Sequence, residues 1–362
     1  MTAANRTPPI RLMVVDDSAY NRRNISDVFA GNPDVEVVGK AADGEEALRL
    51  ASLLRPDVIT LDLEMPRMDG FTFLRILMSK QPTPVIVVSS YSQKENVFKA
   101  LELGALDFVT KPDRQISPDA TELREQILQK VLLVRSLRPT FTPPITRRNV
   151  SGNWGADGKP QSFDGGAPGA YVAPKQVVCI ASSTGGPSAL LEIFGKIPPT
   201  SSAAFLVAQH MPDKFTRTFA ERLDKRGPVR TTEAQDNDSV AKMTGFVCPG
   251  RQCMELFTMG QELRLKVAPS APTDRYVPSA DRLLKSAAAA AGPRCIAVIL
   301  TGMGDDGVEG ARAILEAGGS IVAESQETAV VFGMPGAVVR AGLAAKVLPL
   351  PQIAEFLAQL PV

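Results

Sequence analysis

The chain contains a single histidine, His210, which directly follows an apolar run of strand length, AAFLVAQ. An upstream segment, VVCIASSTGGPSALLEIF, passes from a strand through a tight turn into a helix, and Ser183, Thr184, Gly185 and Gly186 form that turn. Such a turn can present a hydroxyl beside free backbone N–H groups at the positive end of a helix, where an oxyanion is stabilised. A serine nucleophile also needs a base, and this histidine is the only imidazole in the chain.

A third predicted strand end offers the carboxylate that such a pair requires. The segment AVILTGMGDDG places Asp305 and Asp306 after an apolar run, and either could orient the histidine in a Ser, His, Asp order. Each piece alone is weak, because a Ser/Gly turn before a helix is more often a phosphate-binding loop or a helix cap, and a lone histidine is usually structural. Their joint placement at three strand ends favours a hydrolase.

A second group of polar residues lies at predicted strand ends in the first third of the chain. Asp16 and Asp17 follow the first strand and Asp62 follows the third, where open parallel sheets place their ligand sites. Three converging carboxylates suit Mg²⁺. A carboxylate can also form an aspartyl phosphate when a metal and a cation neutralise the phosphoryl charge, and Lys111 can supply that cation. Ser89, at the end of the fourth strand, can offer a hydroxyl to a phosphoryl oxygen.

The elements that must position these residues form two α/β patterns, the first running from Ile10 to about Arg138. Helical segments begin near Ser18, Gly44, Gly70, Gln93 and Pro118. The predicted strands are Ile10 to Val15, Val35 to Val38, Asp57 to Leu61, Pro84 to Val88 and Leu106 to Val109. Five such units predict one compact domain with a parallel sheet.

The stretch from Pro139 to Ala173 has the composition of a linker. It holds six glycines and five prolines among 35 residues, with little apolar periodicity, and so cannot build a core. The single tryptophan, Trp154, lies inside it and is expected to be exposed or loosely docked.

The second α/β pattern is expected to form another mainly parallel sheet. Its helices include 213–225, and short alternation broken by PG and MG between Gly245 and Val267 predicts a hairpin beside the sheet. Its predicted strands are Gln176 to Ala181, Ala203 to Ala208, Cys295 to Leu300 and Ser320 to Ala323.

Composition narrows the class of protein. The 362 residues exceed the usual size of one core, and 44% hydrophobic with 22% charged residues is ordinary for a soluble globular protein. A net charge of +1 gives no electrostatic footprint for nucleic acid, and no apolar run is long enough for a bilayer span. The polar start MTAANRTPP lacks the apolar core of a signal peptide. A cytoplasmic protein with no membrane insertion is expected. Four cysteines without a CxxC pair, expected to be buried free thiols, are Cys179, Cys248, Cys253 and Cys295.

Three other functions are weighed against a hydrolase. A dinucleotide-binding domain is disfavoured because SSTGGP lacks the GxGxxG spacing and the next strand ends in Gln209 and His210 without a ribose-binding acid. A transcription factor is disfavoured because neither a helix-turn-helix pattern nor a basic face is present. A phosphorylation-controlled docking protein of hydrolase ancestry stays open.

Segments of the first pattern resemble the signature segments of response-regulator receiver domains, namely VVDDS, LDLEMPRMDG, VVSS and FVTKP. The resemblance implies a flavodoxin-like (βα)5 receiver domain over 9–137. Asp62 is then the phosphoacceptor and also a metal ligand. Asp16, Asp17 and the backbone carbonyl of Glu64 complete the implied Mg²⁺ site.

The same resemblance implies a receiver switch. Ser89 and Phe108 take the places of the hydroxyl and aromatic switch residues, and Lys111 that of the lysine. Phosphorylation adds about −1.5 to −2 charge, so rearrangement of the loop holding Ser89 and of the ring of Phe108 is implied.

Segments of the second pattern resemble the catalytic domain of the chemotaxis protein-glutamate methylesterases: ASSTGG, AQHMP, PTDRYVPSADRLLKSA, LTGMGDDG and VFGMPGAV. By that resemblance Ser183 is the nucleophile, His210 the base and Asp306 the orienting acid. Thr184 and Met303 line the site and could donate to the oxyanion. The implied arrangement is a linker at 138–173 and a doubly wound, mainly parallel α/β hydrolytic domain over 174–362.

The resemblance to the methylesterases also implies an activity. It is hydrolysis of glutamate methyl esters in methyl-accepting chemotaxis receptors, with deamidation of some receptor glutamines, without a cofactor for the ester step. A chemotaxis histidine kinase is the implied phosphodonor. Two departures from the family pattern are Ala181, where glycine is usual, and Cys253, where histidine is frequent. Neither affects the three residues needed for hydrolysis.

Overall fold

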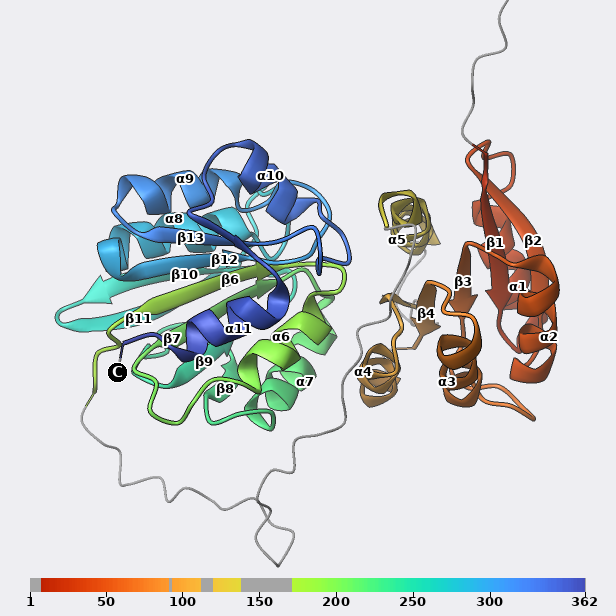
Figure 1. Cartoon of the computed structure of the whole chain (residues 1–362), viewed down its shortest axis with the longest axis horizontal. Coiled ribbons are helices and arrows are strands. Elements are labelled where there is room, and N and C mark those ends of the chain that lie inside the picture. The colour runs from red at the N-terminus through yellow and green to blue at the C-terminus, as the bar shows by residue number, and fades with distance from the viewer. Residues whose placement is uncertain (1–7, 91–92, 112–119, 138–170, 362) are drawn as a thin grey trace, which may run out of the picture.

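The computed structural model describes residues 8–90, 93–111, 120–137 and 171–361, which form two α/β units (Figure 1). Most of the predicted linker at 138–173, including Trp154, lies outside the described residues, as does the predicted helix start near Pro118. Each unit is built on a parallel sheet covered by helices on both faces, and this confirms the α/β fold expected for both parts of the chain.

The first unit has a five-stranded sheet in the order β2-β1-β3-β4-β5, with every neighbouring pair parallel. Its strands are β1 (Ile10–Val15), β2 (Val35–Ala41), β3 (Val58–Leu61), β4 (Val85–Ser89) and β5 (Asp107–Thr110). Its helices are α1 (Ala19–Val28), α2 (Gly44–Leu54), α3 (Gly70–Lys80), α4 (Lys94–Glu102), α5 (Ala120–Leu132) and the 3-10 turn η2 (Leu133–Ser136). These bounds lie within a few residues of those predicted.

Short polar side chains fix where the first helices begin. Ser18, Asp43 and Asp69 each precede a helix and accept hydrogen bonds from its first N–H groups. These groups have no partner within the helix, so a side-chain oxygen at the cap stabilises the helix start. The helices α1, α2 and α3 therefore begin directly after the carboxyl-end loops that carry the acidic residues.

The second unit has a seven-stranded sheet in the order β14-β13-β12-β6-β7-β9-β8 and a separate hairpin, β10-β11. Its strands are β6 (Val177–Ser182), β7 (Ala204–Gln209), β8 (Arg230–Glu233), β9 (Thr244–Val247), β10 (Gln252–Met259), β11 (Glu262–Pro269), β12 (Cys295–Ile299), β13 (Ser320–Glu324) and β14 (Lys346–Leu348). Its helices are α6 (Gly186–Phe194), α7 (Asp213–Asp224), α8 (Ala280–Ala291), η3 (Gly292–Arg294), α9 (Val308–Glu316), α10 (Met334–Arg340) and α11 (Leu350–Ala358).

One part of the prediction for this unit was wrong. The run from Gly245 to Val267 is not a single hairpin, because its first part, β9, pairs in parallel with β7 and β8 inside the main sheet. Only β10 and β11 form the antiparallel hairpin. The edge strands β8 and β14 were not predicted, since RTTE and KVL are short and carry exposed polar residues with little apolar signal.

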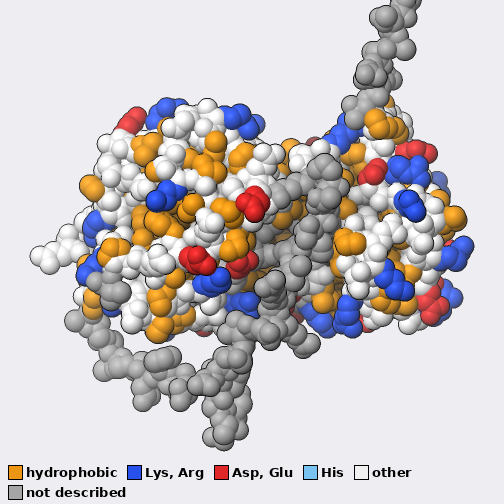
Figure 2. All heavy atoms as spheres, viewed as in Figure 1, with side chains coloured by type: hydrophobic (Ala, Val, Ile, Leu, Met, Phe, Trp, Pro, Cys, Tyr) orange, Lys and Arg blue, Asp and Glu red, His pale blue; other side chains and the backbone are white. Residues whose placement is uncertain are grey.

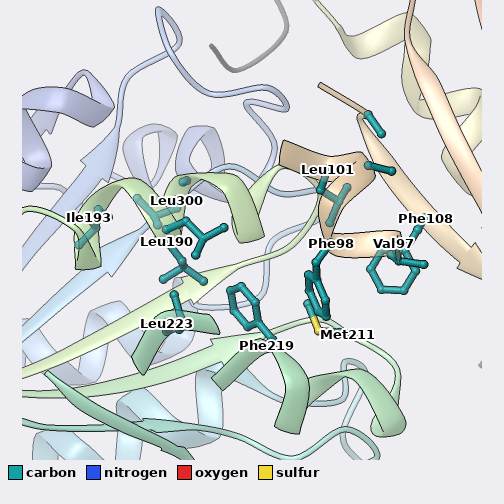
Figure 3. Close-up of a cluster of buried hydrophobic side chains, with 14 of the residues drawn as sticks. Val97, Phe98, Leu101, Phe108, Leu190, Ile193, Met211, Phe219, Leu223 and Leu300 are labelled. Carbon is teal, nitrogen blue, oxygen red and sulfur yellow. The ribbon is translucent and has the colours of Figure 1, made fainter. Parts of the chain in front are cut away.

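Aromatic rings of the two units pack against each other (Figure 3). Phe98 of α4 stacks on Phe219 of α7 with ring centroids 5.6 Å apart, and Phe108 of β5 lies 4.7 Å from Phe215 of α7. All four rings are buried. The apolar contact is continuous with the cores of both units, so α4 and the edge strand β5 form the first unit's side of the junction.

Ion pairs and a hydrogen bond also join the two units beside this aromatic junction. Arg222 of α7 pairs with Glu95 at 2.7 Å and with Glu102 at 2.6 Å, both on α4. The Thr184 hydroxyl donates to the carboxylate of Asp107, 2.5 Å away, and Lys130 pairs with the same carboxylate at 2.5 Å. The residue next to Ser183 is thus hydrogen-bonded to the first unit.

The surface carries charges of both signs. Figure 2 shows Lys and Arg side chains interspersed with Asp and Glu over the visible face of both units. Among the helices of the described residues, none combines the length and the apolar character needed to cross a bilayer.

Candidate active site and phosphorylation site

Strand pairing brings Ser183 and His210 side by side. Strands β6 and β7 are parallel neighbours with Ser182 opposite Gln209, and the two functional residues are the next positions on each strand. The His210 N–H donates to the Ser182 carbonyl at 3.0 Å. Strands β6 and β12 mark the point where the strand order changes direction, which is where open α/β sheets bind ligands.

The side chain of Gln209 ties the two strand ends together. Its Oε1 accepts from the Ser182 hydroxyl at 2.6 Å. Its Nε2 donates to the backbone carbonyls of Ser183, at 2.9 Å, and His210, at 3.0 Å. Gln209 is buried, and buried amides of this kind hold a backbone rigidly when all their groups are satisfied.

Asp306 provides a buried anchor for the histidine. Its Oδ2 lies 2.8 Å from His210 Nε2 and also accepts the Ala280 N–H at 2.8 Å, while its Oδ1 accepts the Asp281 N–H at 2.9 Å. These N–H groups belong to the start of α8, where the helix dipole favours a negative charge. The carboxylate is therefore held by three donors, one of which is the imidazole.

The neighbouring Asp305 has a different set of partners. It accepts from the Tyr276 hydroxyl at 3.0 Å and pairs with the Arg275 guanidinium at 3.1 Å. Of the two carboxylates that the strand-end pattern left open, only Asp306 contacts His210. Asp305 is linked to the imidazole through Tyr276, whose ring stacks on His210.

The Ser183 hydroxyl makes no hydrogen bond with His210 in the described part of the chain. The Ser183 N–H donates to the Thr301 carbonyl at 3.0 Å, which fixes the backbone of the elbow. Because Nε2 donates to Asp306, Nδ1 is the ring nitrogen left free to accept a proton. The register makes their backbones neighbours, so the proposed reaction requires the Ser183 hydroxyl to point at Nδ1.

Two main-chain donors face no partner near the nucleophile. Within residues 171–361 no hydrogen bond involves the N–H of Thr184 or of Met303, both predicted to line the site. Thr184 is 5% exposed and Met303 is 49% exposed, so the first residue is buried and the second reaches the surface. Free N–H groups in such positions can stabilise an oxyanion.

The carboxyl ends of β1 and β3 bring together the predicted acidic cluster. Ligand oxygens of Asp16, Asp17 and Asp62 all lie within 4.8 Å of one another. Lys111 Nζ lies 2.5 Å from Asp62 and 2.9 Å from Asp16. Three carboxylates and one ammonium group are thus close to one another, as an aspartyl-phosphate site requires.

The pKa values of the groups in this cluster depend on one another. Burial raises the pKa of Asp62, and repulsion from Asp16 adds to the rise, while Lys111 opposes it. Burial lowers the pKa of Lys111, but the two carboxylates more than offset this and leave it raised. The lysine is therefore charged, and an added cation would favour the ionised form of Asp62.

One oxygen of this cluster is poised for a cation. Asp16 Oδ2 is buried, and it lies 2.9 Å from the ammonium group of Lys111. Three carboxylates whose oxygens lie this close together are the ligands that a hard divalent ion prefers. The carbonyl of Glu64 as a further ligand stays a prediction; its N–H lies 3.4 Å from Asp62 Oδ1.

The two predicted switch residues are buried. The Ser89 hydroxyl donates to Gln93 Oε1 at 2.5 Å, and the ring of Phe108 packs on Phe215 across the junction. The structure therefore places the aromatic switch position against the second unit.

Comparisons with known proteins identify both units. A family model described as response regulator receiver domain matches residues 12–119, and one described as CheB methylesterase matches 178–357. The protein-glutamate methylesterase/protein-glutamine glutaminase 1 of Myxococcus xanthus strain DK1622 is 44% identical, with 97% of each chain covered. The chain belongs to the protein-glutamate methylesterase/protein-glutamine glutaminase family.

Other members of this family are similarly close. The protein of the same name from Pyrococcus abyssi is 38% identical, covering 96% of this chain and 92% of that one. The crystal structure of the Thermotoga maritima CheB methylesterase catalytic domain is 38% identical, with a TM-score of 0.51 over 52% of this chain and all of that one.

All four cysteines are free and buried, as predicted. At the family's frequent histidine position, Cys253 Sγ lies 3.6 Å from Asp274, and burial raises the pKa of this thiol. It is thus a neutral thiol. Burial likewise raises the pKa of Cys248. Ala181, the other departure, is the second-to-last residue of strand β6 and is buried.

Sequence reasoning missed several residues of the site. Gln209 was named only as a strand-end residue that cannot bind a ribose, although its position directly before His210 could have suggested the strand-end bridge. Tyr276, whose ring stacks on the imidazole, gave no signal of this contact because it lies 66 positions away in the chain. Asp107, which receives the Thr184 hydrogen bond, gave none either.

Gly302 makes room for the nucleophile. A Cβ added there would lie 2.8 Å from Ser183 Cβ and 2.4 Å from Met334 Sδ. We expect Gly302→Ala to displace the elbow and to lower the rate at which a fluorophosphonate labels Ser183 by about 100-fold, since small misplacements at reacting atoms cost this much. Time-resolved mass spectrometry gives the labelling rate, and thermal unfolding shows whether the chain is folded. Labelling at the native rate by the folded variant would refute this role of Gly302.

Proposed function

We propose that the protein hydrolyses γ-glutamyl methyl esters of methyl-accepting chemotaxis receptors and releases methanol. The observation that carries the proposal is the contact of the only imidazole with a buried carboxylate, 2.8 Å away, beside the strand end that bears Ser183. Full-length relatives carry the name protein-glutamate methylesterase/protein-glutamine glutaminase, and their similarity extends over both units.

In the proposed reaction Ser183 attacks the ester carbonyl carbon while His210 Nδ1 takes the hydroxyl proton. The new C–O bond forms a tetrahedral oxyanion, which the N–H groups of Thr184 and Met303 stabilise. His210 returns the proton to the departing methoxide, and methanol leaves. Water then hydrolyses the glutamyl ester of Ser183, with the same histidine acting as base and then as acid.

The same groups can deamidate a receptor glutamine. An amide nitrogen replaces the methoxide, and protonation by His210 lets it leave as ammonia. The names of the relatives include a protein-glutamine glutaminase, which supports this second reaction.

We propose that Asp62 is phosphorylated by a chemotaxis histidine kinase. A carboxylate oxygen of Asp62 bonds to the phosphorus of the kinase's phosphohistidine, the P–N bond breaks and the histidine leaves, while Lys111 neutralises charge on the transferred group. Mg²⁺, held by Asp16, Asp17, Asp62 and the carbonyl of Glu64, would supply further charge neutralisation. We expect the hydroxyl of Ser89, at the end of β4, to bind a phosphoryl oxygen after release from Gln93.

Regulation follows from the contacts at the junction. In the unphosphorylated chain the receiver holds Thr184 through Asp107 and buries Phe108 against α7. We propose that this packing restrains the esterase and that phosphorylation loosens it, since Phe108 would have to leave the junction in order to rearrange. The domains we propose are a receiver at 9–137, a linker at 138–173 and a catalytic domain at 174–362, acting in the cytoplasm.

A docking protein without hydrolysis is the alternative function. It does not require Gln209, Asp306 and the start of α8 to hold a histidine beside a serine elbow. The buried hydrogen bonds of Asp306 favour catalysis.

Methanol release from a methylated receptor tests the proposed function. We expect the native chain to release methanol faster with acetyl phosphate and Mg²⁺, and Ser183→Ala to lose activity by several powers of ten, leaving at most the roughly 10³- to 10⁴-fold over water that binding and the oxyanion donors supply. Chelation of Mg²⁺ or Asp62→Asn should abolish only the stimulation. Equal methanol release by the native chain and Ser183→Ala would leave docking as the function.

The restraint is tested at Arg222, which lies outside the proposed active site. Arg222→Ala removes both ion pairs with α4 and should weaken the junction by about 1–2 kcal/mol, or roughly 5- to 30-fold in the docking equilibrium. We expect a higher rate of methanol release without phosphodonor. The control is Arg217→Ala on the same helix, whose side chain is 80% exposed and pairs only with Glu221 among the described residues. An unchanged basal rate in folded Arg222→Ala would argue against the restraint.

A further inference from the structure

The ring of Tyr276 lies against the catalytic imidazole. The two ring planes differ by 6° and the centroids are 5.4 Å apart, which is an offset stack. His210 comes from the end of β7, whereas Tyr276 comes from the loop before α8, so the contact depends on the fold of the whole second unit. The histidine side chain is only 15% exposed.

The hydrogen bond to Asp306 does not by itself fix the imidazole. Nε2 lies closer than Nδ1 to the Cβ–Cγ axis, so rotation about that bond moves Nδ1 more than it moves Nε2. Rotation about this bond has broad energy wells in histidine. A ring packed on the imidazole face is what resists this rotation, and Nδ1 is the nitrogen that must meet the Ser183 hydroxyl.

We propose that Tyr276 is a positioning residue, whose ring holds the imidazole of His210 in the plane that directs Nδ1 at Ser183. This inference rests on the proposed serine mechanism. It explains how Nδ1 can be directed at Ser183 although Nε2 makes the only hydrogen bond of the imidazole among the described residues.

Other groups hold Tyr276 in place. Its hydroxyl donates to Asp305 at 3.0 Å, and the Arg275 guanidinium lies 5.1 Å from the centre of its ring. Burial and the hydrogen bond to Asp305 raise the pKa of Tyr276, so the hydroxyl keeps the proton that it donates. Asp305 and Arg275 are both exposed, and exposed ion pairs contribute little to stability. We therefore expect the contact between the two rings to matter more than the hydrogen bond of the Tyr276 hydroxyl to Asp305.

The backbone leaves space for this ring. Gly304 has a φ of +92°, and a Cβ added there would lie 2.5 Å from the Tyr276 hydroxyl and 3.0 Å from its Cζ. The two glycines of the sequence GMG thus leave space for different side chains, Gly302 for Ser183 and Gly304 for Tyr276. The loop that carries Asp306 thus lies against both Ser183 and Tyr276.

The test compares Tyr276→Phe, which keeps the ring, with Tyr276→Leu, which removes it. Two rates are measured on the full chain: labelling of Ser183 by a fluorophosphonate, and methanol release from a methylated receptor. In labelling, the serine oxygen bonds to phosphorus, fluoride leaves and His210 takes the proton. We expect Tyr276→Leu to lower both the labelling rate and kcat by about 10- to 100-fold, with KM changed by less than about threefold. We expect Tyr276→Phe and Asp305→Asn to stay within about threefold of the native rates.

Controls separate positioning from folding and from the serine mechanism itself. Tyr171→Leu removes another tyrosine, whose hydroxyl accepts the Leu263 N–H, and should label at the native rate. Thermal unfolding shows whether each variant is folded. The inference is overturned if folded Tyr276→Leu labels like the native chain, or if Tyr276→Phe loses as much as Tyr276→Leu. Labelling of the native chain that Ser183→Ala does not remove would instead contradict the proposed function, and this inference with it.

Discussion

A single backbone hydrogen bond, from the His210 N–H to the Ser182 carbonyl, sets the distance on which the whole active site depends. It is the last rung of the parallel ladder between β6 and β7, and it makes Ser183 and His210 neighbours across the strands. A slip of one residue would turn either side chain to the other face of the sheet. The other contacts of the site, including the Gln209 bridge and the Asp306 anchor, hold a pair that this register has already brought together.

The same constraint operates twice in the chain. In the first unit the order β2-β1-β3 brings Asp16 and Asp62 to one edge, as the order β12-β6-β7 brings Asp306, Ser183 and His210 to one edge in the second. The two edges are linked through β5, whose Asp107 contacts the hydroxyl beside the nucleophile and whose Phe108 packs on α7. A change at the acidic cluster therefore has a short physical route to the elbow.

Much of this was predictable because strand ends carry the chemistry. The strands holding Ser183, His210 and Asp62 were located within one or two residues, since long apolar runs bounded by turns give a strong signal. Strand β9 was misassigned because TGFV is short and its partners β7 and β8 are set by the sheet, not by local pattern. The choice of Asp306 over Asp305 needed the family pattern. Tyr276, Asp107 and the Phe98–Phe219 stack were not predictable, because each contact joins segments distant in the chain.

The most direct measurement is a crystal structure of the full chain with a phosphonyl group bonded to Ser183. We expect the imidazole of His210 to keep its contact with Asp306 through Nε2 and to point Nδ1 at the adduct, within about 3 Å of its serine oxygen. The phosphonyl oxygen should face the N–H groups of Thr184 and Met303. An adduct on a different side chain, or an imidazole turned away from Ser183 with its carboxylate contact broken, would contradict the catalytic arrangement.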